Sequence, residues 1–356
     1  MPNRQPVIAP TIAVDAMGGD HGPSVVIPGA LEAAREDGFA LRLVGDQSLI
    51  EAQLQGLDLT GLDVDVVHAP EVAGMQDKPS DVVRRKKDSS IHVAVSLVKN
   101  GQADGVVSAG NSGATVACGM FIVGRIPGIS RPALASVMPT AKQPMILIDV
   151  GANVDAKPRH LLQFGLMADI MAHDVLGIQR PRVALLSIGE EEGKGNVQVK
   201  ETFELMRASS LNFVGNAEGR DVFTGDVDVV VCDGFVGNVA LKLSEGLGQT
   251  MGHVLKREIT RTWLGRLGTM LNMGGLKRFA RIVDYAEYGG APLLGLKGIV
   301  VVCHGASNVK AIMNAVKMAA RFVRQRSIAH LEQELAKDPG LAAGNDATHK
   351  NTAGAV

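Results

Sequence analysis

The sequence predicts an α/β protein with a three-layer α/β/α arrangement, in which a largely parallel sheet lies between two layers of helices. Short runs of Val, Ile and Leu alternate along the chain with segments whose apolar residues recur at helical spacing. Unbroken apolar runs are typical of parallel strands, which are buried on both faces. Hydrophobic residues make up 46% of the 356-residue chain and aromatic residues only 3%, so aliphatic side chains and Met must fill the core.

Nine apolar runs are predicted to be strands. They occupy residues 11–15, 40–45, 64–69, 103–110, 133–138, 145–151, 182–189, 228–234 and 298–305. Helical spacing follows most of them, most clearly over residues 23–38 and 307–325. Because a chain of this length exceeds what one small core needs, we expect residues 1–330 to form one large α/β unit or two intertwined lobes.

Residues 242–288 have helical spacing but contain no predicted strand. Their centre, RTWLGRLGTMLNMGGLKRFAR (261–281), places the only tryptophan among Leu, Met, Gly and Arg, which predicts two helices that meet at an apolar tip. Residues 254–284 carry seven basic and two acidic residues, a local net charge of +5. The small polar residues at 331–356 show no periodicity and predict a tail that is disordered past about Asp338.

Composition excludes several classes of protein. The formal net charge of −1 leaves no global basic field that could hold a nucleic acid. The N-terminal segment lacks the apolar core of a signal peptide, and no run of 18 apolar residues occurs, so we expect a cytoplasmic protein without a membrane span. Cys118, Cys232 and Cys303 lie far apart in apolar segments, without the spacing of a metal site, so we expect reduced core thiols.

Four predicted strands end in loops that combine glycine with asparagine or serine. SAGNSGATV (108–116), DVGAN (149–153), DGFVGN (233–238) and HGASN (304–308) each place these residues at the start of a predicted helix. Unpaired N–H groups and the helix dipole attract anions there. Each loop by itself equally fits an ordinary helix cap. Because the carboxyl ends of parallel strands meet at one edge, the four loops together predict a site for phosphate or a similar anion.

The first loop of the chain, in IAVDAMGGDHGP (12–23), is predicted to form the opposite wall of that site. Asp15 and Asp20 would repel a bare anion, so we expect them to hydrogen-bond backbone N–H groups or to orient Lys194 and His21. The predicted phosphate cradle is the backbone N–H groups of 110–114 and 305–308. The predicted substrate-binding residues are Asp15, Gly18, Gly19, Asp20, Gly110, Asn111, Ser112, Gly113, Asn153, Gly305 and Asn308.

Two charged segments have both a structural and a functional interpretation. In the loop GEEEGKGN (189–196), Glu190–Glu192 are expected to be solvated, whereas Lys194, between two glycines, is a mobile cation that can close on an anion. The basic run Arg84–Lys87 fits a solvated helix face or a docking site for an acidic partner. No loop contains G-x-x-x-x-G-K-[ST] or G-x-G-x-x-G, so nucleotide binding has weak support.

Six segments in order, between about residues 12 and 327, resemble the bacterial phosphate acyltransferase family of phospholipid synthesis. They are IAVDAMGGDHGP, SAGNSGATVA, DVGANVDAKP, LLSIGEEEGKGN, DVVVCDGFVGNVALK and VVVCHGASN. The resemblance implies an enzyme that moves a fatty acyl group from acyl carrier protein to inorganic phosphate, giving an acyl phosphate that later acylates glycerol 3-phosphate. It implies a fold similar to the isocitrate/isopropylmalate dehydrogenase and phosphotransacetylase group, with one mixed, mostly parallel sheet shared by two lobes.

The resemblance also implies partners and a reacting centre. The expected protein is a cytoplasmic homodimer that associates peripherally with the membrane, in reach of the downstream glycerol-3-phosphate acyltransferase. No metal or organic cofactor is expected for the reaction. Lys194 and Asn238 match positions at the reacting centre of the family.

Attack of phosphate on a thioester needs a bound phosphate, a stabilised oxyanion and a protonated leaving thiolate. Phosphate is largely dianionic near neutral pH, so a strong general base is not essential. Asn238 is the predicted oxyanion donor, and Lys194 is predicted to neutralise the phosphate or the oxyanion. His21 or His304 is predicted to protonate the thiolate, although each fits equally well as a hydrogen-bonded loop residue.

The helical segment 242–288 is predicted to line the acyl groove and to present its tip to an anionic membrane. The alternative is a hairpin buried wholly in the dimer. The acidic acyl carrier protein is expected on Arg84–Lys87 or on the basic stem of the hairpin. The predicted tip residues are Trp263, Leu264, Leu267, Met270 and Leu271.

Three rival functions stay open at this point. They are a phosphotransacetylase-like enzyme that uses short-chain acyl-CoA, a nicotinamide-dependent dehydrogenase and a non-catalytic membrane-associated scaffold.

Overall fold

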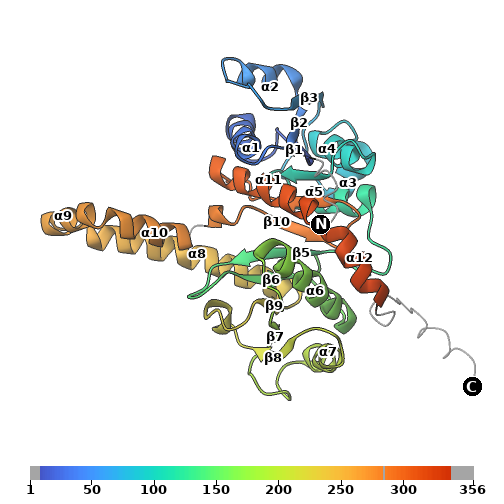
Figure 1. Cartoon of the computed structure of the whole chain (residues 1–356), viewed down its shortest axis with the longest axis vertical. Helices are drawn as coiled ribbons and strands as arrows, with labels where there is room; N and C mark the ends of the chain where they lie inside the picture. Colours follow the sequence, from blue (N-terminus) through green and yellow to red (C-terminus); the bar gives the residue numbers. More distant parts are fainter. Residues whose placement is uncertain (1–8, 284, 338–356) are drawn as a thin grey trace, which may run out of the picture.

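One mixed sheet runs through the whole molecule (Figure 1). The computed structural model describes residues 9–283 and 285–337. Over these ranges the sheet has eleven strands in the order β3-β2-β1-β4-β11-β10-β5-β6-β9-β7-β8. The strands are β1 (Thr11–Asp15), β2 (Ala40–Gly45), β3 (Val64–His68), β4 (Gly105–Ser108), β5 (Ala133–Met138), β6 (Met145–Ile148), β7 (Val183–Leu186), β8 (Phe213–Ala217), β9 (Val229–Val231), β10 (Ala291–Leu294) and β11 (Ile299–Val302).

The direction of the sheet reverses at its centre. β10 is antiparallel to both β11 and β5, and β5 is antiparallel to β6, whereas the other neighbours are parallel. The strands of one lobe, β1–β4 and β11, therefore run opposite to β6–β9 of the other. This arrangement confirms the predicted mixed, mostly parallel sheet.

Helices cover both faces of the sheet, as the predicted three-layer α/β/α class requires. One core lies between the sheet and α1, α6, α7, α11 and α12, and the other between the opposite face and α3, α4, α5 and the start of α8. The helices are α1 (Pro23–Asp37), α2 (Gln47–Leu54), α3 (Pro79–Arg85), α4 (Ser90–Lys99), α5 (Ser112–Cys118), η1 (Gly119–Val123), α6 (Pro158–Met171), η2 (Ala172–Leu176), α7 (Val197–Arg207), η3 (Asp221–Phe223), α8 (Gly234–Ile259), α9 (Trp263–Leu271), α10 (Met273–Val283), η4 (Tyr285–Glu287), α11 (Val309–Arg324) and α12 (Ser327–Lys337).

Two strands escaped prediction, although all nine predicted strands are present. β10 has four residues, includes Pro292 and is flanked by glycines, so its sequence is typical of a loop. It nevertheless lies at the centre of the sheet and pairs with β11 and β5, although Pro292 has no backbone N–H group to donate. β8 is the edge strand and contains Gly215, which interrupts the apolar pattern.

The predicted helical hairpin is confirmed. α8, α9 and α10 extend away from the sheet (Figure 1). α8 begins at Gly234, before the predicted start at 242, because Asp233 Oδ1 accepts the N–H groups of Phe235 and Val236 and caps the helix. In the described ranges, no helix combines the length and apolarity needed to cross a bilayer.

The predicted tail begins later than expected. α12 continues to Lys337, so residues 331–337 are helical and pack through Leu331 and Leu335 into the core. The predicted disorder past Asp338 concerns residues that lie outside the described ranges. The three cysteines are buried and unpaired, as predicted.

Candidate active site

A cavity of about 560 Å³ lies over the central strands, where the two lobes meet. Its walls come from the loop after β4, the end of β5, the exit of β6, the first half of α8, the start of β10 and the exit of β11. Mostly apolar walls with a few polar groups are typical of a small-molecule site. The apolar lining includes Leu134, Val137, Met138, Val150, Leu241, Leu247 and Val302, and the polar lining includes Ser112, Ser136, Thr140, Asn238, Ser244, His304 and Ser307.

The cavity receives loops from opposite edges of the sheet. The prediction that the four glycine-rich loops share one edge is wrong, because β6 and β9 run opposite to β4 and β11. Ser112 and His304 from one edge and Gly151 and Asn238 from the other still line one cavity. A four-residue strand such as β6 spans only about 13 Å, so groups from both edges reach the same space.

The exits of β1, β4 and β11 pack closely against one another. A Cβ atom on Gly18 would lie 2.6 Å from the Gly110 nitrogen, and one on Gly19 would lie 3.0 Å from the Gly305 carbonyl oxygen. The Asp20 N–H donates to that carbonyl at 2.8 Å. Only residues without side chains permit so close an approach. The structure therefore brings these five predicted residues together, but none of them is among the residues that line the cavity.

Asp15 is buried and stabilises its own part of the fold. Ser108 Oγ donates to Asp15 Oδ2 at 2.6 Å and accepts the Gly110 N–H at 3.1 Å. Burial raises the pKa of Asp15, and the hydrogen bond from Ser108 opposes that rise. The contacts of Asp15 are thus with Ser108 and with backbone N–H groups of its own loop, at Met17 and Gly18.

Three of the predicted asparagines hold loops and helix ends. Asn111 Nδ2 donates to three backbone carbonyls within residues 74–77, and its Oδ1 caps α5. Asn308 Oδ1 caps α11 in the same way. Asn153 Nδ2 donates to the Pro132 carbonyl. Asn111 and Asn308 are thus helix caps, whereas Asn153 holds the exit of β6 against the residue before β5.

Part of the predicted phosphate cradle is also occupied. The Gly110 N–H donates to Ser108 and the Ala114 N–H to Asn111. The Ala306 N–H donates to His304 Nδ1. Ser112 does line the cavity, and Gly113 beside it lets α5 approach Pro79. What remains of the predicted cradle at the cavity is Ser112 and the exit of β11.

Asp149 organises the exit of β6, and the sequence pattern did not single it out. Its Oδ1 accepts the N–H groups of Leu134, Gly151 and Ala152, and its Oδ2 accepts both N–H donors of Asn153. The carboxylate is fully buried. A buried acid directly after a strand, followed by Gly and Asn, is the signal that would have found it. This network fixes Gly151 in the wall of the cavity.

Asn238 lies beside Gly151 because α8 packs directly on the exit of β6. A Cβ atom on Gly237 would lie 1.9 Å from the Asp149 carbonyl oxygen, so only glycine permits this contact. Gly151 in turn has the Asn238 side chain 3.7 Å from its own ideal Cβ position. The amide of Asn238 is exposed and lines the cavity, which leaves it accessible to a substrate.

Lys194 is exposed and is not among the described residues that line the cavity. Its loop is held by an ion pair between Glu190 and Arg220 and another between Glu192 and Arg207. The three glutamates are exposed, as predicted, and two of them, Glu190 and Glu192, are paired. These ion pairs hold the loop in an arrangement in which Lys194 does not line the cavity.

His304 lines the cavity, whereas His21 is exposed outside it. His21 is therefore not placed as a catalytic residue by this geometry. His304 Nδ1 accepts the Ala306 N–H at 3.1 Å, so the neutral ring carries its proton on Nε2. That N–H can donate a hydrogen bond to a group in the cavity.

An ion pair on α8 also lines the cavity and was not predicted. Lys242 Nζ lies 2.8 Å from Glu245 Oε2. Leu241 and Lys242 lie three and four residues after Asn238, and Glu245 lies four and three residues after them, so the four share one face of the helix. The helical spacing from Asn238 was the sequence signal that could have identified Lys242 and Glu245 as lining residues.

Cys303 lies in the wall of the cavity but cannot serve as a nucleophile. The side chain is almost fully buried, and burial raises the pKa of its thiol to about 12. A thiol with this pKa is protonated near neutral pH, and only the thiolate is a strong nucleophile. The geometry therefore favours direct attack by a bound acceptor over a covalent cysteine intermediate.

Comparison with known proteins identifies the family. The family described as "Fatty acid synthesis protein" matches residues 10–330. The phosphate acyltransferase of Nitratidesulfovibrio vulgaris is 64% identical over 331 residues, which cover 93% of this chain and 96% of that protein. The phosphate acyltransferase of Lawsonia intracellularis is 60% identical over 319 residues, covering 89% and 92% respectively. The chain belongs to this family of phosphate acyltransferases. The predicted resemblance is confirmed, and with it the prediction of an acyltransferase enzyme of lipid synthesis.

Solved structures support the same fold for this phosphate acyltransferase. A phosphotransacetylase from Streptococcus pyogenes superimposes with a TM-score of 0.62 at 18% identity, covering 90% of this chain and 94% of that chain. A branched-chain phosphotransacylase from Enterococcus faecalis gives a TM-score of 0.52 at 17% identity, covering 88% and 98%. These likenesses concern the fold alone, and they confirm the predicted fold class.

Proposed function

We propose that this phosphate acyltransferase takes a long-chain fatty acyl group from acyl carrier protein and transfers it to inorganic phosphate in the cavity beside Asn238. The observation that carries the proposal is the composition of the cavity. Its apolar walls suit the acyl chain, and its few polar groups suit a thioester carbonyl and an anion.

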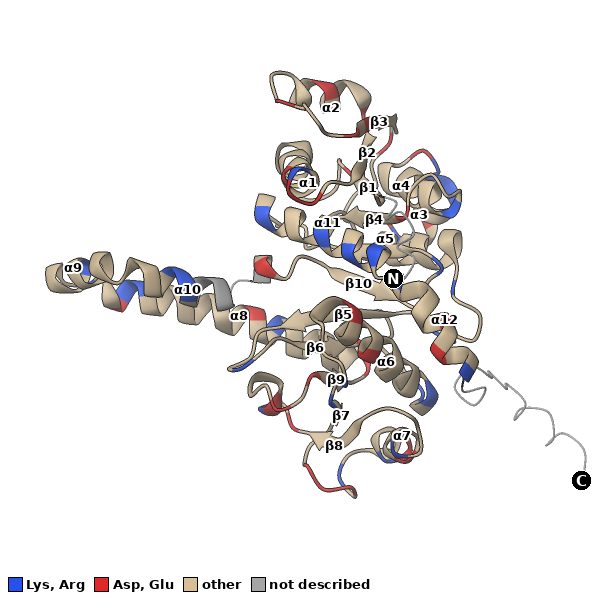
Figure 2. Ribbon diagram, viewed as in Figure 1, with Lys and Arg blue, Asp and Glu red and all other residues tan. Residues whose placement is uncertain are grey.

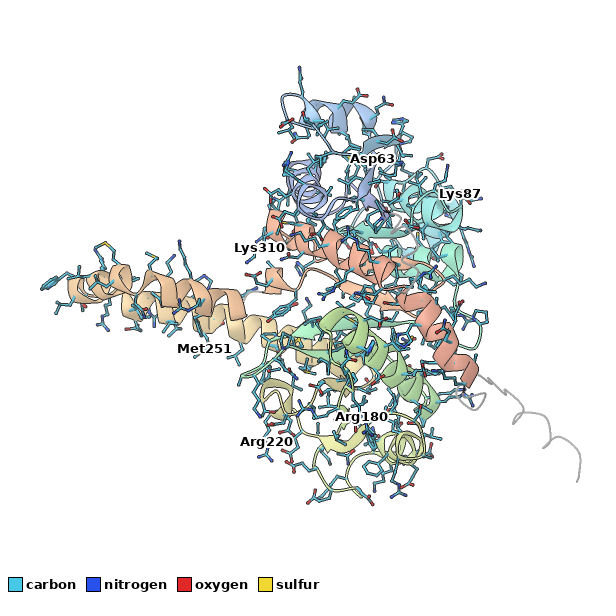
Figure 3. The ribbon with its side chains drawn as sticks, viewed as in Figure 1. Asp63, Lys87, Arg180, Arg220, Met251 and Lys310 are labelled. Atoms are coloured by element: carbon cyan, nitrogen blue, oxygen red, sulfur yellow. The ribbon has the colours of Figure 1, made fainter. Side chains whose placement is uncertain are left out.

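An exposed apolar stripe on α8 supports a long acyl chain. Leu243, Leu247, Met251 and Leu255 recur every four residues, with exposed fractions of 69%, 61%, 59% and 38% (Met251 is labelled in Figure 3). Leu247 also lines the cavity. The stripe thus leads from the cavity along the hairpin. An acetyl group would need no such extension.

Each polar group of the site has a role in the proposed chemistry. Phosphate oxygen attacks the thioester carbonyl carbon, the carbonyl oxygen becomes an oxyanion, and the carbon–sulfur bond then breaks. Asn238 donates to the oxyanion, and the Nε2–H of His304 donates to the oxyanion or to the departing sulfur. Ser112 contributes a hydroxyl to the phosphate, and Lys194 adds positive charge when its loop closes.

The tip of the hairpin is the proposed membrane contact. Trp263, Leu264, Leu267, Met270 and Leu271 of α9 are between 44% and 79% exposed. Figure 2 shows Lys and Arg along the same hairpin. Arg266 lies in α9 and Lys277 in α10. Apolar side chains beside basic ones favour an anionic lipid surface. This contact would give the enzyme a peripheral place in the cytoplasm, near a downstream glycerol-3-phosphate acyltransferase.

A homodimer and a carrier-protein site complete the proposal. The part of the apolar stripe on α8 that lies beyond the cavity is the proposed dimer contact. Arg84, Arg85 and Lys87 are exposed and form the proposed docking surface for acidic acyl carrier protein (Lys87 is labelled in Figure 3). Lys86 is excluded from that surface because it is held by Asp77 at 3.0 Å.

A donor assay tests the proposed reaction. The enzyme is incubated with inorganic phosphate and either long-chain acyl carrier protein or acetyl-CoA, and acyl phosphate is trapped with hydroxylamine. We expect turnover of the long-chain donor and a large loss of it in Lys194→Ala, with Lys200→Ala on the neighbouring helix as the matched control. Turnover of acetyl-CoA alone would show a short-chain phosphotransacetylase instead. Unchanged activity in Lys194→Ala would remove that residue from the mechanism.

A further inference from the structure

A cluster of histidines and carboxylates lies where η2, the continuation of α6, meets α12. Asp174 in η2 is 8% exposed, and its neighbour His173 lies with Nδ1 2.9 Å from Asp174 Oδ1. His330 of α12 places its own Nδ1 3.0 Å from the same oxygen. None of the three lines the active-site cavity. The reaction proposed above leaves this cluster without a role.

The local fold explains how the cluster forms. α6 widens into the π-helical turn η2 at Ala172, and such turns displace side chains from the regular helical face. α12 lies beside α6 in Figure 1, and Leu331 and Leu335 anchor it in the same core. His173 and His330 then meet edge to face, with ring centroids 5.4 Å apart. Asp174 and His330, which meet here, are 156 positions apart in the sequence.

Two further carboxylates surround the three residues. Asp169 precedes His173 by one helical turn, and Glu334 follows His330 by one turn with Oε1 3.9 Å from His330 Nε2. Asp169 lies within electrostatic range of His173, His330 and Glu334. Lys337 is the cation that pairs with Glu334. Among these groups Asp169, Asp174 and Glu334 outnumber Lys337, and this excess of carboxylates favours a dication near the two imidazoles.

We propose that His173, Asp174 and His330 bind one Zn²⁺ ion, which clamps α12 onto the end of α6. The three ligand atoms lie within 4.8 Å of one another. Tetrahedral zinc with bonds of about 2.0–2.1 Å holds its ligand atoms about 3.3 Å apart. The two nitrogen–oxygen distances of 2.9 and 3.0 Å must therefore lengthen slightly, and the two imidazole nitrogens must come to about 3.3 Å from each other. Imidazole nitrogen with a carboxylate oxygen is a ligand set that zinc accepts, and water completes the fourth position, because Glu334 faces Nε2 of His330 and not the Nδ1 that binds the ion.

The proposed ion has a structural role. It replaces the hydrogen bonds between each Nδ1 and Asp174, and each ring then carries its proton on Nε2. The bond formed is metal–nitrogen or metal–oxygen, and no electron is transferred. Because the ion bridges α6 and α12, it binds the folded chain better than the unfolded one and stabilises it.

Zinc titration of the full-length, untagged protein tests the proposal. Metal-free enzyme is titrated with Zn²⁺ in competition with a chromophoric zinc indicator. We expect one tight site per chain, and a loss of affinity of about tenfold or more in His330→Ala. His253→Ala, which removes an exposed histidine of α8, is the matched control and retains the site. Equal affinity in His330→Ala and wild type, or no zinc bound at micromolar concentration, overturns the proposal.

Thermal unfolding gives a second, independent measurement. Zinc should raise the Tm of the wild type and of His253→Ala, and EDTA should reverse the rise. His330→Ala should show no zinc-dependent rise. If His330→Ala does not fold, His173→Gln replaces it, since this side chain is partly exposed on η2. A zinc-dependent rise of the same size in either cluster variant shows that the ion binds elsewhere and refutes the assignment.

Discussion

Asn238 is placed at the cavity by two neighbours that take no part in the chemistry. Asp233 caps α8 and sets where the helix begins, and Gly237 lets the first turns of the helix lie against the exit of β6. The side-chain amide is thereby held on a rigid helix and needs no loop closure to reach substrate. Preorganised donors of this kind stabilise a developing oxyanion most effectively.

The first prediction concerns the amide of Asn238. Asn238→Ala should lower kcat about 10²–10³-fold because one oxyanion donor is lost. The KM for phosphate should change little, since the donor acts on the carbonyl oxygen. Steady-state kinetics with long-chain acyl carrier protein measures both quantities. Ser244→Ala is the control, because Ser244 also lines the cavity but donates its hydroxyl to Ala240. A kcat within threefold of the wild type in Asn238→Ala would contradict the assignment.

At the scale of elements, a close contact and an ion pair with a buried carboxylate hold α8 and the second lobe in place. α8 touches the exit of β6 through Gly237, and the ion pair joins Arg182 and Asp228, the residues directly before β7 and β9. Both contacts depend on the chemical identity of single residues, so a substitution at one of these residues should weaken the contact. Each therefore supports a prediction of stability.

The second prediction concerns the packing of α8. Gly237→Ala should destabilise the protein by about 2–3 kcal/mol or more, because the added Cβ would overlap the Asp149 carbonyl oxygen. Gly252→Ala in the same helix is the control: its Cβ meets no atom within 4 Å, and it should stabilise the helix by about 0.5–1 kcal/mol. Urea unfolding measures both. Equal stabilities would show that α8 does not lie against β6.

The third prediction concerns the pH dependence of stability. Asp228 is 2% exposed, and it accepts hydrogen bonds from Arg182 Nε and Nη2 and from Gln143. Burial acts to raise the pKa of Asp228, but the bonds from Arg182 outweigh it and the pKa is lowered. The contribution of Asp228 to stability is therefore present above the ordinary Asp pKa and is lost as the pH falls through the lowered value.

Asp228→Asn should consequently cost about 1–2 kcal/mol at pH 7, because it removes the charge that pairs with Arg182, whose side chain is 37% exposed so that solvent screens the pair. The difference from the wild type should shrink as the pH falls below about 4, because the wild-type carboxylate then becomes protonated. Denaturant unfolding at several pH values measures this. A difference that stays constant from pH 7 to pH 3 would show that the charge of Asp228 contributes nothing.

At the scale of the whole molecule, the hairpin separates the proposed membrane contact from the catalytic sheet. α8 starts at the cavity wall, and α9 lies at the far end of the hairpin (Figure 1). In the 26-residue helix α8 the rise is about 1.5 Å per residue, so the tip stands roughly 35–40 Å from the first turn. A lipid-derived chain and a soluble phosphate can therefore be handled at different ends of one element.

The fourth prediction tests this separation. The double substitution Leu267→Gln with Leu271→Gln should lower binding to anionic vesicles at least about tenfold, because each buried Leu contributes about 1.5–3 kcal/mol. Turnover of a soluble acyl carrier protein donor should stay near the wild-type value. Co-sedimentation and the acyl phosphate assay measure the two properties. Leu49→Gln with Leu57→Gln, which changes two exposed leucines in the other lobe, is the matched control. Vesicle binding unchanged by the tip substitutions would place the membrane contact elsewhere.

The elements themselves were predictable to the extent that their signals are local. Most of the nine apolar runs are strands that are buried on both faces and must therefore be apolar throughout, and this property is visible in three to six consecutive residues. β10 escaped because Pro292 and its flanking glycines are typical of loops, and its place is stabilised only by β5 and β11, which are distant in sequence. His21 and His304 could not be separated by pattern either, since both follow strands beside glycine.

By itself the sequence determined the fold class, the hairpin and the family, because hydrophobic periodicity, glycine-rich turns and ordered motifs are properties of neighbouring residues. The tertiary structure decided which of the candidate residues share a cavity. It brought Ser112, Asn238 and His304 together, gave Asn111 and Asn308 to helix caps and left Lys194 outside. The physical reason is the reversal at β10, β5 and β6: strand direction depends on pairing between distant segments, and that direction decides which loops meet.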